Sequence, residues 1–122
     1  MLTGIGCDLI EIKRIEHACK KEAFLSRVYT EEERRQAGGR PSVLAGTFAV
    51  KEAVAKVFGT GFREFSPHDV EVLRDQLGKP FVHLHGRAES LAKERGICRI
   101  EVSISDTKEY AMAVAAGEGE TV

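Results

Sequence analysis

Small and hydrophobic residues recur at helical spacing between positions 42 and 61, and they predict one long central helix. One side of this helix carries the larger apolar residues Val43, Val50, Val54, Val57 and Phe58. The opposite side is built mostly from Ala45, Ala49, Ala53 and Ala55. We expect Ser42, which follows Pro41, to be the N-cap, and Gly59 and Gly61 to mark the end. A helix that is apolar or small on nearly every side belongs in the interior of a domain.

Three charged residues interrupt this helix: Lys51, Glu52 and Lys56. Glu52 and Lys56 are four residues apart and therefore share a face, which is otherwise alanine. Two interpretations stay open. The pair is an ordinary salt bridge along the helix, or it is a carboxylate and an ammonium that bind a ligand on a surface of small residues.

Alternating residues from Leu2 to Ile12 predict a strand. Gly4, Gly6 and Asp8 share one face of it, and the two glycines leave room for a ligand or for another backbone. An ionised aspartate among apolar neighbours is costly unless it is paired or binds a metal. The alternative is that Asp8 ends the strand or caps a turn in solvent.

Residues 13–22 predict an amphipathic helix with an inner stripe of Ile12, Ile15 and Cys19. From position 13 to 27 the chain has a net charge of +3, from the basic residues Lys13, Arg14, Lys20, Lys21 and Arg27 and the acidic residues Glu16 and Glu22. Such a run is either a solvated helix face or a docking surface for an acidic protein partner.

The rest of the chain alternates between short helices and strands. Thr30 and Glu33 have the spacing of a capping box and predict a helix start. Beyond Gly61 we expect a hairpin of strands 69–74 and 81–85, a helix over 86–95, and strands 97–105 and 109–116 joined by a turn at 105–108. In the first of these strands, the residues that share one face are Val70, Val72 and Arg74.

His83 and His85 share one face of the second hairpin strand. Two histidines at this spacing are a possible transition-metal pair. No third ligand lies near them in the sequence, which favours a plain exposed strand face.

Composition narrows the class of protein. The chain has 122 residues, which fits one domain over 1–122, and it is 43% hydrophobic and 30% charged. A net charge of −1 argues against nucleic-acid binding, and no apolar run is long enough to span a membrane. The first eight residues lack the features of a signal peptide, and three cysteines show no paired metal spacing. We therefore expect a reduced, cytoplasmic protein.

Three segments together resemble the holo-acyl-carrier-protein synthase family of small bacterial 4′-phosphopantetheinyl transferases: GIGCDLIE at 4–11, FAVKEAVAK at 48–56 and VSIS at 102–105. The resemblance covers essentially the whole chain. It implies an α+β fold in which a long central helix packs on a mostly antiparallel sheet, and a homotrimer with active sites at subunit interfaces. It also implies Mg²⁺-dependent transfer of 4′-phosphopantetheine from coenzyme A to a serine of apo acyl carrier protein, as in fatty acid biosynthesis. Adenosine 3′,5′-bisphosphate is the other product.

The resemblance assigns roles to individual positions. Asp8 and Glu52 match the family's metal-binding acids, and Glu52 is also the candidate for activating the carrier serine. Lys56 matches the lysine near the phosphates. The other positions expected to contact coenzyme A are Gly59, Thr60, Gly61, Pro80, Asp106 and Thr107. Arg14 matches the arginine that meets the carrier protein, and Lys21 is expected to assist it.

Two positions depart from the family pattern. Thr47 stands where the family commonly has arginine, and Asp106 stands where it commonly has histidine. Losing a cation and gaining an acid should weaken phosphate binding unless other residues compensate. Asp106 is also at home in a turn, where an aspartate bonds its own backbone. These departures favour the competing interpretation, a non-catalytic module that binds coenzyme A or a carrier protein, whereas Asp8, Glu52 and Lys56 argue against it.

Overall fold

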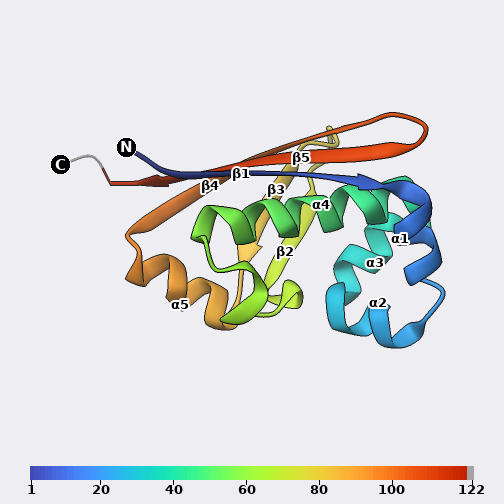
Figure 1. Ribbon diagram of the computed structural model, residues 1–122, viewed down its shortest axis with the longest axis horizontal. Helices are drawn as coiled ribbons and strands as arrows, with labels where there is room; N and C mark the ends of the chain where they lie inside the picture. Colours follow the sequence, from blue (N-terminus) through green and yellow to red (C-terminus); the bar gives the residue numbers. More distant parts are fainter. Residues whose placement is uncertain (121–122) are drawn as a thin grey trace.

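The computed structural model describes residues 1–120, in which a long central helix packs between antiparallel strands and shorter helices (Figure 1). In chain order the elements are β1 (Leu2–Glu11), α1 (Ile12–Ala18), α2 (Glu22–Val28), α3 (Glu31–Ala37), α4 (Pro41–Phe58), two 3₁₀ turns (Gly61–Arg63 and Pro67–Asp69), β2 (Val70–Arg74), β3 (Pro80–Leu84), α5 (Gly86–Glu94), β4 (Ile97–Asp106) and β5 (Tyr110–Gly119). The α+β class predicted from the sequence is confirmed. The strands form two sheets, β1-β5-β4 and β2-β3, and all pairings are antiparallel.

Helix α4 is the buried centre of the molecule, as its pattern predicts. Figure 1 shows it running beneath the three-stranded sheet, with α1–α3 at one end and α5 near the other. Gly59 ends it in the left-handed conformation, with φ of 76°, which glycine adopts without a Cβ penalty. The predicted N-cap, Ser42, is wrong. Pro41 is already in the first helical turn and Arg40 is the N-cap, since the missing amide of proline suits a position whose N–H has no helical partner.

Strand β1 lies directly against the backbone of α4. A Cβ at Gly6 would stand 2.0 Å from the carbonyl oxygen of Ala53, and one at Gly4 would stand 2.8 Å from that of Val57. The room that these glycines leave is therefore taken by another backbone and not by a ligand. The predicted alternation of β1 is confirmed, because Gly4, Gly6, Asp8 and Ile10 face inward.

The two faces of the three-stranded sheet differ sharply in burial. Ala111, Ala113 and Ala115 of β5 are buried in the core, where the sheet packs on α4. The opposite face exposes apolar side chains of β1 and β5: Ile5, Leu9, Tyr110, Met112 and Val114. These alanines are covered within one chain, so they do not provide a surface for packing between chains.

The helix predicted over 13–22 is wrong in extent. Helix α1 ends at Ala18, and α2 begins at Glu22 after Lys21 adopts an extended conformation, with ψ of 121°. The predicted inner stripe is confirmed, because Ile12 and Ile15 are buried and Cys19 packs partly buried against the same cluster. Helix α3 begins as predicted, because Thr30 and Glu33 form both hydrogen bonds of a capping box.

A buried ion pair joins α3 to α4. Lys51 Nζ lies 2.9 Å from Glu33 Oε2, and both side chains are at most 1% exposed. Lys51 Nζ also donates to the carbonyls of Pro67 and Val70, at 2.9 and 2.6 Å. The Glu33 carboxylate accepts from the amides of Thr30 and Val72, at 2.8 and 2.7 Å. Lys51 therefore points into the core, away from the surface that Glu52 and Lys56 share.

The remaining predicted strands are confirmed within a few residues of their ends. Strands β2 and β3 form the expected hairpin, with Val72 opposite Val82. Strand β5 extends to Gly119, three residues beyond the predicted end. No helix within residues 1–120 is both long and apolar enough to cross a membrane.

Candidate active site

A pocket of about 440 Å³ lies where β1 leaves the edge of α4 and meets α1. Four of the residues predicted for the site line it: Asp8, Arg14, Glu52 and Lys56. The other lining side chains are apolar, at Leu9, Ile10, Ile15, Ala18, Phe24 and Phe48. The structure therefore brings together two acids and two bases that the chain separates by up to 48 residues.

Asp8 is in the middle of β1 and opposite Ala113 of β5, so it neither ends the strand nor caps a turn. Its side chain is 19% exposed. Lys56 Nζ lies 3.6 Å from Asp8 Oδ1 and donates to the carbonyl of Cys7 at 2.8 Å. Lys56 thus reaches from α4 across to β1 and does not pair with Glu52, so the ordinary helix salt bridge considered for these two residues does not form.

The two carboxylates of this pocket are held in an environment that resists their ionisation. Burial raises the pKa of Asp8, and the charge of Lys56 only partly offsets it. Burial also raises the pKa of Glu52, and the negative charge of Asp8 adds to that effect. A negative charge close to Glu52 disfavours its ionised form. A bound cation relieves this repulsion.

These residues fit a Mg²⁺ ion. Mg²⁺ is usually held by one or two carboxylates, keeps several waters and takes the remaining oxygens from substrate phosphates. Asp8 and Glu52 provide two carboxylates from different elements, and the pocket has space for waters and a phosphate beside them. The placement of two acids from different elements on the wall of one pocket is the observation that favours an ion here.

One of the two basic residues predicted to meet a carrier protein lines this pocket. That residue is Arg14, whereas Lys21 is exposed just before α2. All five basic side chains between 13 and 27 are exposed. The exposed positive charges expected from the sequence are therefore present, and Arg14 is the one on the pocket of the two acids.

The residues predicted to contact coenzyme A are not gathered into one pocket by a single chain. Gly59, Thr60 and Gly61 follow the last turn of α4, whereas Asp106 and Thr107 lie at the β4–β5 turn. Figure 1 shows these two places at opposite ends of α4. A helix of 18 residues spans about 27 Å. The diphosphate region of one coenzyme molecule therefore cannot contact both sets of residues in the same chain.

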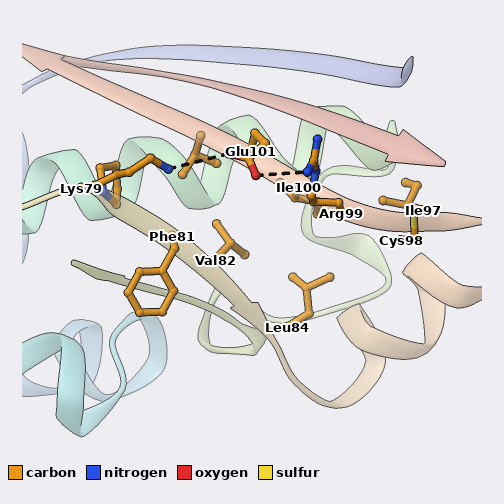
Figure 2. Close-up of a pocket in the computed structure, with 11 residues that line it drawn as sticks. Lys79, Phe81, Val82, Leu84, Ile97, Cys98, Arg99, Ile100 and Glu101 are labelled. Carbon is orange, nitrogen blue, oxygen red and sulfur yellow. Dashed lines mark ion pairs between the residues drawn. The ribbon is translucent and has the colours of Figure 1, made fainter. Parts of the chain in front are cut away.

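Pro80 lines a second pocket, which lies between β3 and β4 and holds about 350 Å³ (Figure 2). Lys79 and Arg99 both pair with Glu101 beside it, at 3.7 and 3.6 Å. The floor of this pocket is apolar, from Val82, Leu84, Ile97, Ile100 and Val102. Neither carboxylate of the first pocket reaches it, so Pro80 is separated from the candidate metal site.

Arg74 is a further cation near the position where the family arginine was expected, and the sequence analysis assigned it no role. Its Nη1 donates to Thr47 Oγ1 at 2.9 Å, so β2 places a guanidinium where the family arginine was expected on α4. Burial lowers the pKa of Arg74, while the charges of Glu33 and Asp106 act in the opposite direction. The signal was present in the alternation of β2, which puts an arginine on the same inward face as two buried valines.

The β4–β5 turn is held by Thr107. Thr107 Oγ1 accepts from the amides of Glu109 and Tyr110, at 3.3 and 3.1 Å, and the Thr107 amide donates to the Tyr110 carbonyl at 2.8 Å. These are the bonds that an aspartate was expected to make. Asp106 is exposed at the end of β4, so its carboxylate is available to act through its charge.

Comparisons with known proteins agree with this arrangement. Residues 4–115 match the model of the 4′-phosphopantetheinyl transferase superfamily. A holo-[acyl-carrier-protein] synthase of Lachnoclostridium phytofermentans is 52% identical over 118 residues, which is 97% of each chain. The crystal structure of a holo-[acyl-carrier-protein] synthase from Neisseria meningitidis has a TM-score of 0.87 at 37% identity, covering 97% of this chain and 99% of that one. A Helicobacter pylori holo-[acyl-carrier-protein] synthase in complex with coenzyme A has a TM-score of 0.84 at 30% identity, covering 93% and 99%.

Proposed function

This chain belongs to the 4′-phosphopantetheinyl transferase superfamily, and from that premise we propose that it is a holo-acyl-carrier-protein synthase. It moves 4′-phosphopantetheine from coenzyme A to a serine of apo acyl carrier protein and releases adenosine 3′,5′-bisphosphate. The observation that carries the proposal is the pairing of Asp8 on β1 with Glu52 on α4 in one pocket, beside Lys56.

The reaction breaks the phosphoanhydride bond of the coenzyme A diphosphate and forms a phosphodiester between phosphopantetheine and the serine. The serine oxygen attacks the phosphorus that carries pantetheine, and the bond from that phosphorus to the bridging diphosphate oxygen breaks. Such a transfer depends mainly on positioning and on neutralising charge. Mg²⁺, held by Asp8 and Glu52, neutralises phosphate charge when bound. Lys56 adds a second positive charge on the departing phosphate side, where its ammonium stabilises or protonates the leaving oxygen.

Glu52 is our candidate for the general base that takes the serine proton, directly or through a water. Its carboxylate lines the same pocket as Asp8 and Lys56, where the serine and the diphosphate would meet. Its position on the rigid central helix holds the carboxylate at the pocket wall.

The carrier protein docks on the exposed positive surface of α1 and α2, with Arg14 at the edge of the pocket and Lys21 further out. Complementary charges of this kind mainly speed association and select the partner. The exposed thiols of Cys7 and Cys98 suit a reducing compartment, and we place the reaction in the cytoplasm, in fatty acid biosynthesis.

The working enzyme is a homotrimer with active sites between subunits. Two observations support this. Gly59–Gly61 and Asp106–Thr107 lie at opposite ends of α4, so one coenzyme contacts both sets only if two subunits contribute. The outer sheet face also exposes Ile5 and Leu9, which are 68% and 66% exposed in a single chain. Burying such a surface between subunits is favourable.

Mass spectrometry distinguishes this function from a non-catalytic binding module. Apo carrier protein incubated with the enzyme, coenzyme A and Mg²⁺ gains the mass of phosphopantetheine, whereas a binding module adds no mass. Asp8→Ala and Glu52→Ala abolish the transfer and keep the fold, while Glu89→Ala, an exposed acid on α5, leaves it unchanged. Full activity of either pocket variant at low Mg²⁺ contradicts the metal assignment.

A further inference from the structure

A second cluster of ligating side chains lies on the outer face of the β2–β3 hairpin, away from the pocket of Asp8 and Glu52. Glu71 of β2 is directly opposite His83 of β3, and His85 follows two residues later on the same face. The ligand atoms of all three side chains lie within 4.8 Å of one another. Within residues 1–120 this is the one group of three or more His, Cys, Asp or Glu side chains that is so close.

The three side chains already face a common point. Glu71 Oε1 and His85 Nε2 are 3.0 Å apart. The imidazole rings of His83 and His85 have centroids 4.5 Å apart and are inclined by only 33°, so they lie almost parallel. The sequence offered His83 and His85 as a metal pair that lacked a third ligand. Glu71 on the neighbouring strand is that third ligand, and it lies twelve residues before His83 in the sequence.

A hydrogen bond from Thr30 orients the carboxylate of Glu71 on the side away from the histidines. Thr30 Oγ1 donates to Glu71 Oε2 at 2.6 Å, while Oε1 is left toward the histidines. Thr30 is buried at the N-terminus of α3, and the Glu71 side chain is only 13% exposed. Hydrogen bonds of this kind, which orient a ligand from outside the metal site, are typical of metal centres.

We propose that Glu71, His83 and His85 bind one divalent transition-metal ion of the zinc type. Two imidazoles and one carboxylate, with a fourth position for water, are a common tetrahedral donor set for Zn²⁺. Mg²⁺ prefers oxygen ligands, so the two sites of this protein select different ions. The hairpin site ties β2 and β3 to the start of α3 through Thr30.

Small side-chain rotations complete the geometry. Bonds of about 2.0–2.2 Å in a tetrahedron set ligand atoms about 3.3 Å apart. The Glu71–His85 pair is already near this spacing, and His83 is exposed and free to close the remaining gap.

Charge at the site also favours a cation. The ammonium of Lys51 is buried behind the strand, where it donates to the carbonyl of Val70 at 2.6 Å. Glu33 is the direct ion-pair partner of Lys51 at 2.9 Å, so Glu71 Oε1 stays directed toward His85 and available to a cation.

The test is calorimetric titration of the full chain with Zn²⁺ in excess Mg²⁺, which occupies the acidic pocket. Exposed thiols also take zinc, so the titration uses the Cys7→Ser/Cys98→Ser background. One ion should bind per chain. His83→Ala and His85→Ala should each raise the Kd by about tenfold or more. The matched control, His17→Ala on the exposed face of α1, should leave it unchanged.

Cobalt gives a spectroscopic reading of the same site. Co²⁺ in the same background should show the intense visible absorption of a tetrahedral ion, and Glu71→Gln should diminish it. Absence of binding at one ion per chain overturns the proposal, and Glu71 and His85 are then only an ion pair. Equal affinities for the His83→Ala, His85→Ala and unsubstituted proteins also overturn it.

Discussion

Lys51 and Glu33 form an ion pair of 2.9 Å that is closed off from solvent on both sides. Three acceptors surround the Lys51 ammonium, one for each of its protons. The neighbouring Glu52 therefore lies on α4 next to a residue that is anchored to α3 and β2, and the position of the helix along its axis is fixed by polar as well as apolar contacts.

Removing one partner of this pair should be costly. Lys51→Met leaves the Glu33 carboxylate buried without its cation, which typically destabilises a protein by about 3–5 kcal/mol. Urea unfolding followed by circular dichroism measures the loss. Lys93→Met, at an exposed ion pair of 4.0 Å on α5, is the matched control and should change stability by less than about 0.5 kcal/mol. Comparable stabilities for the two variants contradict the structural role of Lys51.

The raised pKa values of Asp8 and Glu52 predict how pH affects the metal-free protein. An acid whose folded pKa exceeds its unfolded value binds more protons in the folded state, so stability falls as pH rises from about 4 through the folded pKa. Mg²⁺ reverses the trend, because it binds the ionised forms. Melting temperatures measured with chelator across this range should show the fall, and Asp8→Asn/Glu52→Gln should remove it. A stabilisation by Mg²⁺ that is as large at pH 4 as at pH 7 would exclude these two ligands.

Docking by charge predicts a selective kinetic effect. Arg14→Glu should raise the apparent KM for carrier protein far more than the KM for coenzyme A. The effect should shrink with added salt, because exposed charges are screened over about 8 Å at physiological ionic strength. Lys93→Glu on α5 makes the same charge reversal far from α1 and should leave both constants unchanged. Equal changes in the KM for carrier protein and the KM for coenzyme A in Arg14→Glu would contradict a docking role for Arg14.

Mutations of Thr107 and Asp106 should have different effects, the first on stability and the second on coenzyme binding. Thr107→Val removes the hydroxyl that holds the β4–β5 turn and should lower stability by about 1 kcal/mol. Asp106→His keeps those bonds, so its melting temperature should stay the same. We propose that the coenzyme binds beside this turn, so removing the negative charge should lower the apparent KM for coenzyme A with little change for carrier protein. Weaker coenzyme binding by Asp106→His would mean that Asp106 helps the site.

The exposed sheet face predicts the assembly state. Leu9→Glu places a charge opposite Met112 on the outer face of β1 and β5. Light scattering should report a trimer for the unsubstituted protein and smaller species for this variant. Leu77→Glu changes a leucine that is 95% exposed at the hairpin tip and serves as the control. A monomer that keeps full activity would contradict the trimer.

Periodicity alone was enough to predict the elements that build the candidate site. The helical spacing of alanines and valines placed Glu52 and Lys56 on one surface of α4, and strand alternation put Asp8 on the same face as two glycines. Both predictions depend on near neighbours in sequence, which is why they succeeded. The break between α1 and α2 was missed, because no glycine or proline marks residues 19–21, where Lys21 leaves the helical conformation.

The sequence did not predict side-chain contacts between residues that are far apart in the chain. Arg74 meets Thr47 and Glu71 meets His85 only because the β2–β3 hairpin folds against α3 and α4. Lys51 looked like one of three surface charges, and only the buried carboxylate of Glu33 explains why it turns inward. In each case the deciding contact joins residues that are 14 or more positions apart.

Gly6 acts as a spacer for the chemistry, although it carries no functional group. The contact of its backbone with the carbonyl of Ala53 sets how close β1 can approach α4, and Asp8 and Glu52 are attached to those two elements within two residues of that contact. Any larger residue at position 6 would lift the strand from the helix and widen the gap between the carboxylates. The separation of the two carboxylates that we propose as metal ligands thus depends on the absence of a single methyl group.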